Sequence, residues 1–282
     1  MADALKLMCI LAHPDDESLG TGGIVAKYSA EGVETYLVTA TRGEHGWSGP
    51  AEDYPGPEAL GRVREGELRV AAEVLGLRDV AFLGYEDGYL DRADPATVTA
   101  QIAAHIRRVR PQVVVTFEPS GAYGHPDHIA ICQFSIAAVV AAADPSFSPL
   151  PEALARPELR AWDRLPAHRV SKLYYFVGTR QRMADYQAIF GDIAMPVDGV
   201  ERRPTAWEDW AITTRIDTSA HWQTVKRAIE AHRSQLPGYD DLLKLPGDEH
   251  LRLWREATLY RAFSLVNGGR AVEADLFEGI RD

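Results

Sequence analysis

Two short clusters of histidine and acidic residues, far apart in the chain, carry side chains that could do chemistry. They are His13-Pro14-Asp15-Asp16-Glu17 and His125-Pro126-Asp127-His128. A histidine and three acids packed together are costly to bury unless something compensates their charge, and a bound cation is the simplest candidate. Each cluster alone is weak evidence, because such spacings arise by chance and an acidic pair can simply be a solvated turn or helix cap.

Ligands drawn from both clusters would suit a zinc ion. His13, Asp16 and His128 form a set of two histidines and one carboxylate, and catalytic zinc sites typically use three protein ligands and leave the fourth position to water. Such an ion lowers the pKa of the water to about 7 and polarises a carbonyl oxygen. Iron or another divalent ion also suits this type of ligand.

The other polar residues of the clusters fit the same chemistry. Asp15 would then be free to act as the base that takes the proton of the water. His125, if protonated, could stabilise a tetrahedral oxyanion or give a proton to a leaving amine. Asp127 could hold the ring of His125 in place. We interpret Glu17 as structural, bonding amides of the first helical turn.

Short apolar strands alternate with helical patterns through most of the chain. Strands are predicted at 5–11, 33–41, 80–83, 113–117 and 172–177, with a further candidate at 211–216. Helices are predicted at 18–31, 58–75, 95–110, about 127–143 and 220–234. This alternation predicts an α/β fold that is Rossmann-like, with a mostly parallel sheet flanked by helices on both faces.

The predicted fold brings the two clusters to one edge of the sheet. In open α/β sheets, sites form in the crevice outside the carboxyl ends of the strands. The His13 cluster follows the strand at 5–11, and the His125 cluster follows the strand at 113–117. The shared edge argues for a metal site more strongly than either cluster does by itself.

The bulk properties of the chain narrow the classes of protein. We predict one domain over residues 1–282, with irregular insertions near 144–169 and 191–204. The net charge of -11 argues against nucleic acid and against an anionic membrane as partners. The first apolar run is too short to span a bilayer, so a cytoplasmic location is expected. Cys9 and Cys132 lie in apolar segments and are interpreted as buried, reduced thiols. A homo-oligomer is a further expectation for the assembly.

The two clusters together resemble the motifs of the PIG-L (LmbE-like) family of zinc-dependent N-acetylglucosaminyl deacetylases. The resemblance runs from the first strand to roughly residue 140, about half the chain. Further matches are Gly20-Thr21-Gly22-Gly23, Thr41-Arg42-Gly43-Glu44 and Arg64-Glu65-Gly66-Glu67-Leu68. Late in the chain, Ala231-His232-Arg233-Ser234-Gln235 resembles a weaker family signature.

The resemblance implies roles for the residues that match. His13, Asp16 and His128 would hold the metal. Asp15 would be the general base, and His125 would assist at the oxyanion and the leaving group.

Residues outside the two clusters are candidates for contact with substrate. Tyr123 and Arg64 stand where relatives contact the intermediate or the sugar, although Arg64 could instead form an ion pair with Glu67 on the same helix. Glu44 lies at the start of a loop rich in glycine, proline and acids. Trp47 in that loop could stack on a sugar ring, and a packing role suits it equally. His232 either lines the pocket or caps its helix.

We therefore expect a metal-dependent hydrolase that removes the acetyl group from an N-acetylated amino sugar. Two alternatives remain open. One is an amidase of the same family that cleaves a larger acyl group, such as that of a thiol conjugate. The other is a non-catalytic module that binds a sugar or nucleotide, which would have no need of Asp15 beside a complete ligand set.

Overall fold

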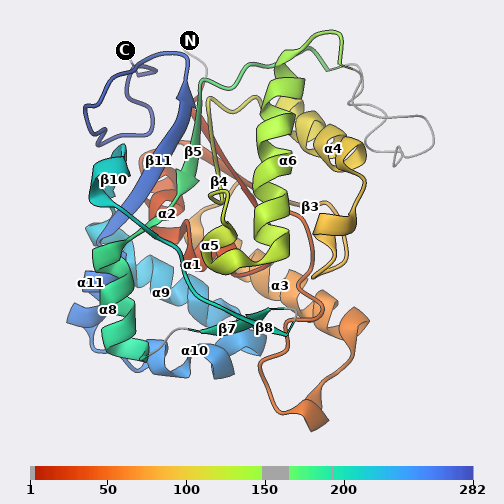
Figure 1. Ribbon diagram of the computed structural model, residues 1–282, viewed down its shortest axis with the longest axis vertical. Helices are drawn as coiled ribbons and strands as arrows, with labels where there is room; N and C mark the ends of the chain where they lie inside the picture. The colour runs from red at the N-terminus through yellow and green to blue at the C-terminus, as the bar shows by residue number, and fades with distance from the viewer. Residues whose placement is uncertain (1–3, 148–164, 192–193, 198, 282) are drawn as a thin grey trace.

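A seven-stranded sheet lies at the centre of the structure, a computed structural model that describes residues 4–147, 165–191, 194–197 and 199–281 (Figure 1). In chain order its strands are β1 (Lys6–Leu11), β2 (Glu34–Thr39), β3 (Asp79–Phe82), β4 (Val113–Thr116), β5 (Lys172–Phe176), β10 (Thr214–Asp217) and β11 (Glu256–Ser264). In space the order is β10-β11-β5-β4-β1-β2-β3. Strands β3, β2, β1, β4 and β5 are parallel, and β11 runs antiparallel to both of its neighbours.

Helices cover both faces of this sheet. The helices that connect the parallel strands are α2 (Gly22–Ala30), α3 (Pro57–Leu75), α4 (Pro95–Val109) and α6 (Pro126–Ala143). Helices α2 and α3 connect β1, β2 and β3 on one face, whereas α4 and α6 pack against each other on the other face (Figure 1). The predicted Rossmann-like α/β fold, mostly parallel with helices on both faces, is confirmed.

The remaining elements gather at the carboxyl end of the strands. They are α1 (Asp16–Leu19), α5 (Gly121–Gly124), α8 (Arg180–Phe190), α9 (Trp222–Ala231), α10 (Leu236–Leu243) and α11 (Gly247–Trp254), with the short pairs β6 (Gly178–Thr179)–β9 (Ala206–Trp207) and β7 (Met195–Val197)–β8 (Val200–Arg202). Figure 1 shows α8, α10 and the β7–β8 hairpin beneath α1 and α5, at the end of the molecule away from both chain termini.

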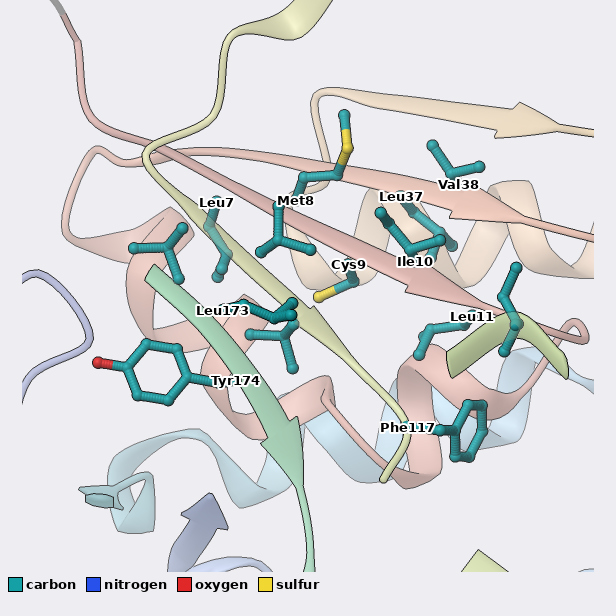
Figure 2. Packing of buried hydrophobic residues seen from close by; sticks show 14 of the residues in the cluster. Leu7, Met8, Cys9, Ile10, Leu11, Leu37, Val38, Phe117, Leu173 and Tyr174 are labelled. Carbon is teal, nitrogen blue, oxygen red and sulfur yellow. The ribbon is translucent and has the colours of Figure 1, made fainter. Parts of the chain in front are cut away.

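The parallel strands are apolar because the helices bury them on both faces. All four residues of β4 are buried, as are five of the six residues of β1. Figure 2 shows the side chains of β1 packing among those of β2 and β5, with Phe117 at the end of β4. Cys9 and Cys132 belong to this core as free, buried thiols, as predicted.

Local sequence signals explain where the helices begin and end. Helix α3 starts at a proline and stops at Gly76, whose φ of 81° is the left-handed conformation that glycine adopts without penalty. Helix α4 has Pro95 in its first turn, and the carboxylate of Asp94 accepts a hydrogen bond from the amide of Thr97 at 2.8 Å. Each of these boundaries lies within one residue of its prediction.

Helix α6 is long and apolar enough to cross a membrane, by length and composition alone. In the structure 56% of it is buried inside the protein, against α4, β1 and β4. An apolar helix that covers a sheet needs no membrane to bury its surface. We therefore interpret α6 as a core helix.

The structure differs from the sequence-based expectations in several elements. The predicted helix at 18–31 is two helices, α1 and α2, separated at Gly20, where a Cβ atom would lie 2.8 Å from the ring of Phe176. The irregular stretch at 191–204 contains the β7–β8 hairpin, and α8, α11 and β11 lie where the sequence patterns predict no element. In the stretch at 144–169, residues 148–164 lie outside the described residues, so the single domain over 1–282 stays a prediction.

A buried ion cluster ties the C-terminal segment to the antiparallel side of the sheet. Glu273, which is 1% exposed, accepts hydrogen bonds from Lys172 at 2.7 Å and from Tyr174 and Thr214 at 2.8 Å. Arg261 forms an ion pair with the same carboxylate at 2.8 Å. Burial alone would raise the pKa of Glu273, but the hydrogen bonds, led by that from Lys172, lower this pKa to about 2.

Replacing Glu273 with alanine should therefore destabilise the protein. The substitution leaves Lys172 buried without its partner, and we expect a loss of about 3–5 kcal/mol in the free energy of unfolding. Urea titration followed by circular dichroism measures this loss. Glu278→Ala is a matched control in the same segment, because Glu278 is exposed. A loss for Glu273→Ala no larger than that of the control would contradict the assignment.

The lowered pKa of Glu273 also predicts that its contribution to the free energy of unfolding depends on pH. The folded-state pKa of Glu273 lies below its unfolded value of about 4.3. Its stabilising contribution is therefore complete above that value and is lost as the pH falls toward 2. The difference in stability between wild type and Glu273→Ala should shrink over this range.

Candidate active site

The two polar clusters meet where the strand order of the sheet reverses. Strands β1 and β4 are neighbours, but β1 leads to β2 on one side and β4 leads to β5 on the other. The His13 cluster leaves the carboxyl end of β1, and the His125 cluster connects α5 to α6 after β4. This reversal is the point at which open α/β sheets bind ligands.

Three predicted metal ligands converge at this point. Nδ1 of His13 lies 3.2 Å from Nε2 of His128. The carboxylate of Asp16 approaches these two nitrogens, with one oxygen 3.7 Å from the first and the other 3.5 Å from the second. Tetrahedral ligands at about 2.1 Å from a zinc ion are about 3.4 Å apart. The three distances, two of them measured to different oxygens of Asp16, are close to that spacing.

A ring nitrogen of His125 also lies within 4.8 Å of ligand nitrogens of His13 and His128. Nδ1 of His125 accepts a hydrogen bond from the backbone amide of Asp127 at 3.1 Å, so its Nε2 is the nitrogen that carries a proton. This protonation state suits a donor to substrate, and we keep His125 outside the ligand set.

Two buried carboxylates hold His13 from its other side. Nε2 of His13 lies 3.0 Å from Asp87 and 3.1 Å from Asp127. Donation of the Nε2 proton to these acids leaves the lone pair of Nδ1 for a metal, as is usual for metal-bound histidines. Asp127 is fully buried and also accepts hydrogen bonds from the amides of Gly88 and Leu90.

The role expected of Asp127 therefore needs a correction. The sequence suggests that Asp127 holds the ring of His125, its neighbour in the chain. The structure instead directs the Asp127 carboxylate to His13, and it is the backbone amide of Asp127 that donates to His125. Proximity in sequence is a poor guide here because Asp127 faces β1 from the first turn of α6.

The local charges shift the pKa values of the candidate ligands. Burial would lower the pKa of His13, but hydrogen bonds to Asp127 and Asp87 raise it well above its usual value. Burial and the nearby His13 lower the pKa of His128 well below its usual value, so His128 stays neutral. Burial raises the pKa of Asp16 to about 7, against the opposing effect of His13. The carboxylates gathered around His13 and Asp16 favour the binding of a cation between them.

Asp15 lines the same cavity as the candidate ligands but binds other side chains. Its φ of 106° is rare for a residue with a side chain, and such conformations cluster at functional sites, where the surrounding structure imposes them. The Oδ2 atom of Asp15 accepts hydrogen bonds from Tyr239 at 2.8 Å and from Arg64 at 3.1 Å. Asp15, the candidate base, and Asp16, the candidate ligand, are adjacent in sequence but contact different side chains.

Arg64 acts on Asp15 within the protein. Its buried guanidinium also donates to the carbonyl oxygens of Gly43, at 2.9 Å, and Pro14. The alternative ion pair with Glu67 is not what the structure shows, because the Glu67 carboxylate accepts hydrogen bonds from Ser234. Arg64 does line the cavity, so its predicted contact with substrate stays a prediction.

A cavity of about 800 Å³ opens over these residues. Its volume is within the range of small-molecule sites and suits a glycoside. The lining includes His13, Asp15, Asp16, Arg64, Asp87, Tyr123, His125, His128, Met183, Tyr186 and Tyr239. Burial and the nearby Asp16 and Asp15 raise the pKa of Tyr123, so its hydroxyl stays protonated and can donate to a ligand.

Two of the predicted substrate contacts do not line this cavity. Glu44 accepts hydrogen bonds from the amides of Arg42 and Asp87, so it holds its own loop. The indole of Trp47 donates to the carbonyl oxygen of Pro50 at 2.8 Å. The loop does overhang the cavity as expected, but through other residues, His45 and Gly46.

Sequence reasoning missed Asp87 and Tyr239, which contact the predicted site residues His13 and Asp15. Asp87 follows β3, the next strand along the same edge, so an acid before a glycine at a strand end was a usable signal. Tyr239 had no comparable signal, because its partner Asp15 is 224 residues away.

The structure also assigns partners to the two polar residues left outside the chemistry. His232 does not line the cavity but is the C-cap residue of α9, where its backbone amide donates to the carbonyl oxygen of Ile229. Its side chain forms a buried ion pair with Glu17 at 2.7 Å. Glu17 also accepts a hydrogen bond from the Asp15 amide, in keeping with the structural role expected of it.

A Rossmann-like fold that presents histidines and carboxylates in a metal-sized cluster, with a separate aspartate beside them, has the features of a metal-dependent hydrolase. Comparisons with known proteins agree. Residues 8–139 match the PIG-L family model, described as GlcNAc-PI de-N-acetylase.

Curated relatives and solved structures extend the match to nearly the whole chain. A 1D-myo-inositol 2-acetamido-2-deoxy-alpha-D-glucopyranoside deacetylase of Thermobifida fusca is 36% identical, over 82% of this chain and 83% of the relative. A deacetylase of the same name from Thermobispora bispora is 32% identical, over 99% and 100%. The fold resembles that of a conserved protein of Thermus thermophilus, with a TM-score of 0.62 and 25% identity, over 94% of this chain and 97% of that one. The chain belongs to the PIG-L family.

The geometry predicts the effect of removing a ligand. His13→Ala and His128→Ala should each reduce bound zinc below the one ion per chain expected of the wild type, because two protein ligands hold zinc more weakly than three. Elemental analysis of dialysed protein measures this. His221→Ala is the control, since His221 lies at the start of α9, outside the cavity lining. Full zinc content in both ligand variants would refute the ligand set.

Proposed function

We propose that the protein removes the acetyl group from an N-acetylglucosamine-containing small molecule by metal-assisted attack of water. The observation that carries this proposal is the approach of His13, Asp16 and His128 within 3.7 Å of one another, with Asp15 beside them on separate partners. The family and the names of the relatives support the same reaction.

His13, Asp16 and His128 would hold the metal, and we propose zinc. When bound, such an ion supplies a water of pKa about 7 and polarises the amide carbonyl. Asp87 and Asp127 keep the Nε2 proton of His13 in place, so that Nδ1 remains a ligand. Iron or another divalent ion is compatible with the same donors, and the identity of the metal is part of the proposal.

Asp15 takes the proton of the attacking water. Arg64 and Tyr239 both bind its Oδ2 atom and so fix the plane of the carboxylate. Oδ1 is then the oxygen that accepts the proton. A base held in one orientation loses little entropy when the proton is transferred.

His125 and Tyr123 act on the other side of the scissile bond. The Nε2 proton of His125 can stabilise the oxyanion by a hydrogen bond or pass to the departing amine. The protonated hydroxyl of Tyr123 is a second donor at the same wall of the cavity. Their rings lie 6.0 Å apart, so both can address one substrate group.

The substrate is proposed from the relatives and from the size of the cavity. The relatives from Thermobifida fusca and Thermobispora bispora are named as deacetylases of an N-acetylglucosaminyl inositol. A cavity of about 800 Å³ has room for a sugar and its aglycone. Cytoplasmic location, assembly into homo-oligomers and the absence of nucleic acid and membrane partners stay predictions.

The role of Asp15 predicts a variant that binds metal but does not turn over. Asp15→Asn preserves the shape of the side chain and removes the base, so kcat should fall about 10²–10⁴-fold while zinc content is unchanged. Amine release from the N-acetyl sugar measures kcat. Asp53→Asn, at an exposed position in the loop before α3, is the control. Full activity of Asp15→Asn would overturn the assignment of the base.

The nature of the acyl group and sugar can be tested with a panel of substrates. Zinc-loaded protein should release amine and acetate from N-acetylglucosamine derivatives, among which we include the free sugar, inositol and malate glycosides and chitin oligomers. We expect the inositol glycoside to give the highest kcat/KM. Release of a larger acid from a thiol conjugate, with none from the acetylated sugars, would favour the amidase alternative.

A further inference from the structure

We propose that residues 232–239, here called the C-terminal brace, position the catalytic base Asp15 from the far end of the chain. The brace follows α9 and runs into α10, beyond the residues 8–139 that match the family model. The proposal rests on the proposed role of Asp15 as base. It assigns a positioning role to two side chains in particular, His232 and Tyr239.

The first contact fixes the backbone of Asp15. The Asp15 amide donates to Oε2 of Glu17 at 2.9 Å, and Nε2 of His232 lies 2.7 Å from Oε1 of the same carboxylate. The side chains of His232 and Glu17 are 0% and 1% exposed. A buried carboxylate with a partner on each oxygen has one orientation. That orientation holds the amide of Asp15 in its left-handed conformation, which needs such support.

The second contact fixes the carboxylate of Asp15. The hydroxyl of Tyr239 donates to Oδ2 at 2.8 Å, on the same oxygen that Arg64 contacts at 3.1 Å. Two donors on Oδ2 restrain rotation of the carboxylate, and neither of them occupies Oδ1, the oxygen to which we assign the proton. Tyr239 lines the cavity but acts through Asp15 and not on substrate.

The third set of contacts fixes the surroundings of Arg64. Ser234 donates to the Glu67 carboxylate from its amide at 2.8 Å and from its hydroxyl at 2.7 Å, which ties the brace to α3. The side-chain amide of Gln235 donates to the carbonyl oxygen of Gly46 at 2.7 Å. Arg64 is a residue of α3, and its guanidinium contacts the loop that contains Gly46. The brace therefore binds both the helix that carries Arg64 and the loop that Arg64 contacts.

These contacts converge on one residue. The brace reaches the Asp15 amide through Glu17, and Tyr239 contacts the Asp15 carboxylate directly. It reaches Arg64, the second donor to that carboxylate, through α3 and the loop that contains Gly46. The Ala231–Gln235 signature supplies the first and third of these routes through His232, Ser234 and Gln235. The side chains of His232, Ser234 and Gln235 face the inside of the protein, where they bind Glu17, Glu67 and the carbonyl oxygen of Gly46.

The decisive test is Tyr239→Phe, which removes a single oxygen. A hydrogen bond to a charged group is lost, so we expect kcat to fall about 10- to 100-fold, with KM within about threefold and zinc content unchanged. Tyr36→Phe is the matched control. Tyr36 also donates to a carboxylate, that of Glu34 at 2.9 Å, but it lies on β2 outside the cavity lining.

A double variant separates positioning from a general structural role. If Tyr239 acts through Asp15, then Asp15→Asn combined with Tyr239→Phe should be no slower than Asp15→Asn alone. Multiplied losses in the double variant would overturn the proposal, and so would a kcat of Tyr239→Phe within about twofold of wild type. These outcomes are distinct from failure of the proposed function, in which Asp15→Asn itself would remain active.

His232 is tested by a conservative pair of variants. His232→Gln keeps a donor that can reach Glu17, and His232→Leu does not. We expect kcat of the glutamine variant to exceed that of the leucine variant by about tenfold, at similar KM and zinc content. Equal kcat in the two variants would remove His232 from the brace. Should the leucine variant fail to fold, the Tyr239 variants decide the proposal.

Discussion

The organisation of the site depends on one constraint, the burial of several like charges at the carboxyl ends of β1 and β4. Asp16, Asp87 and Asp127 all approach the ring of His13 within 3.7 Å. Such a group is unfavourable in a protein interior unless each charge has a partner. Protons, amides of the neighbouring loops and a divalent cation are the partners that this arrangement can accept. The fold supplies the first two, and the donor geometry suits the third.

The sheet meets this constraint through its strand order. Because β1 pairs with β4, side chains more than a hundred residues apart in sequence come together at one point. At this reversal the connections that leave β1 and β4 run to opposite sides of the sheet, which leaves a crevice between them. The loop after β3 then brings Asp87 and the amides of Gly88 and Leu90 against His13 and Asp127.

The parallel part of the fold is readable in the sequence because its strands are buried on both faces. Val113–Thr116 is a continuous apolar run, and prolines and glycines mark the ends of α3 and α4. Strand β11 is not readable. It contains Arg261 and Glu256, which form ion pairs with groups from other parts of the chain, so its sequence lacks the apolar run of a central strand.

The same distinction between local patterns and distant contacts applies to the residues of the site. The ligand candidates lie in two compact clusters that each follow a recognisable strand, so local patterns are sufficient to predict their meeting. The contact of Tyr239 with Asp15 and that of Asp127 with His13 join distant segments of the chain, and no local pattern encodes either of them. Glu44 and Trp47 mislead for the opposite reason, because they lie in the correct loop while their neighbours in that loop face the cavity.

The sharpest division of roles falls between Asp15 and Asp16. The two residues have identical functional groups and adjacent positions, yet one faces the histidines and the other faces Arg64 and Tyr239. The left-handed backbone at Asp15 is what separates them, because it reverses the chain before α1 begins. That conformation costs roughly 1–3 kcal/mol, which surrounding contacts must offset. A base that must stay off a nearby cation therefore needs a rigid enclosure, and here Arg64 and Tyr239 supply it from segments far apart in the chain.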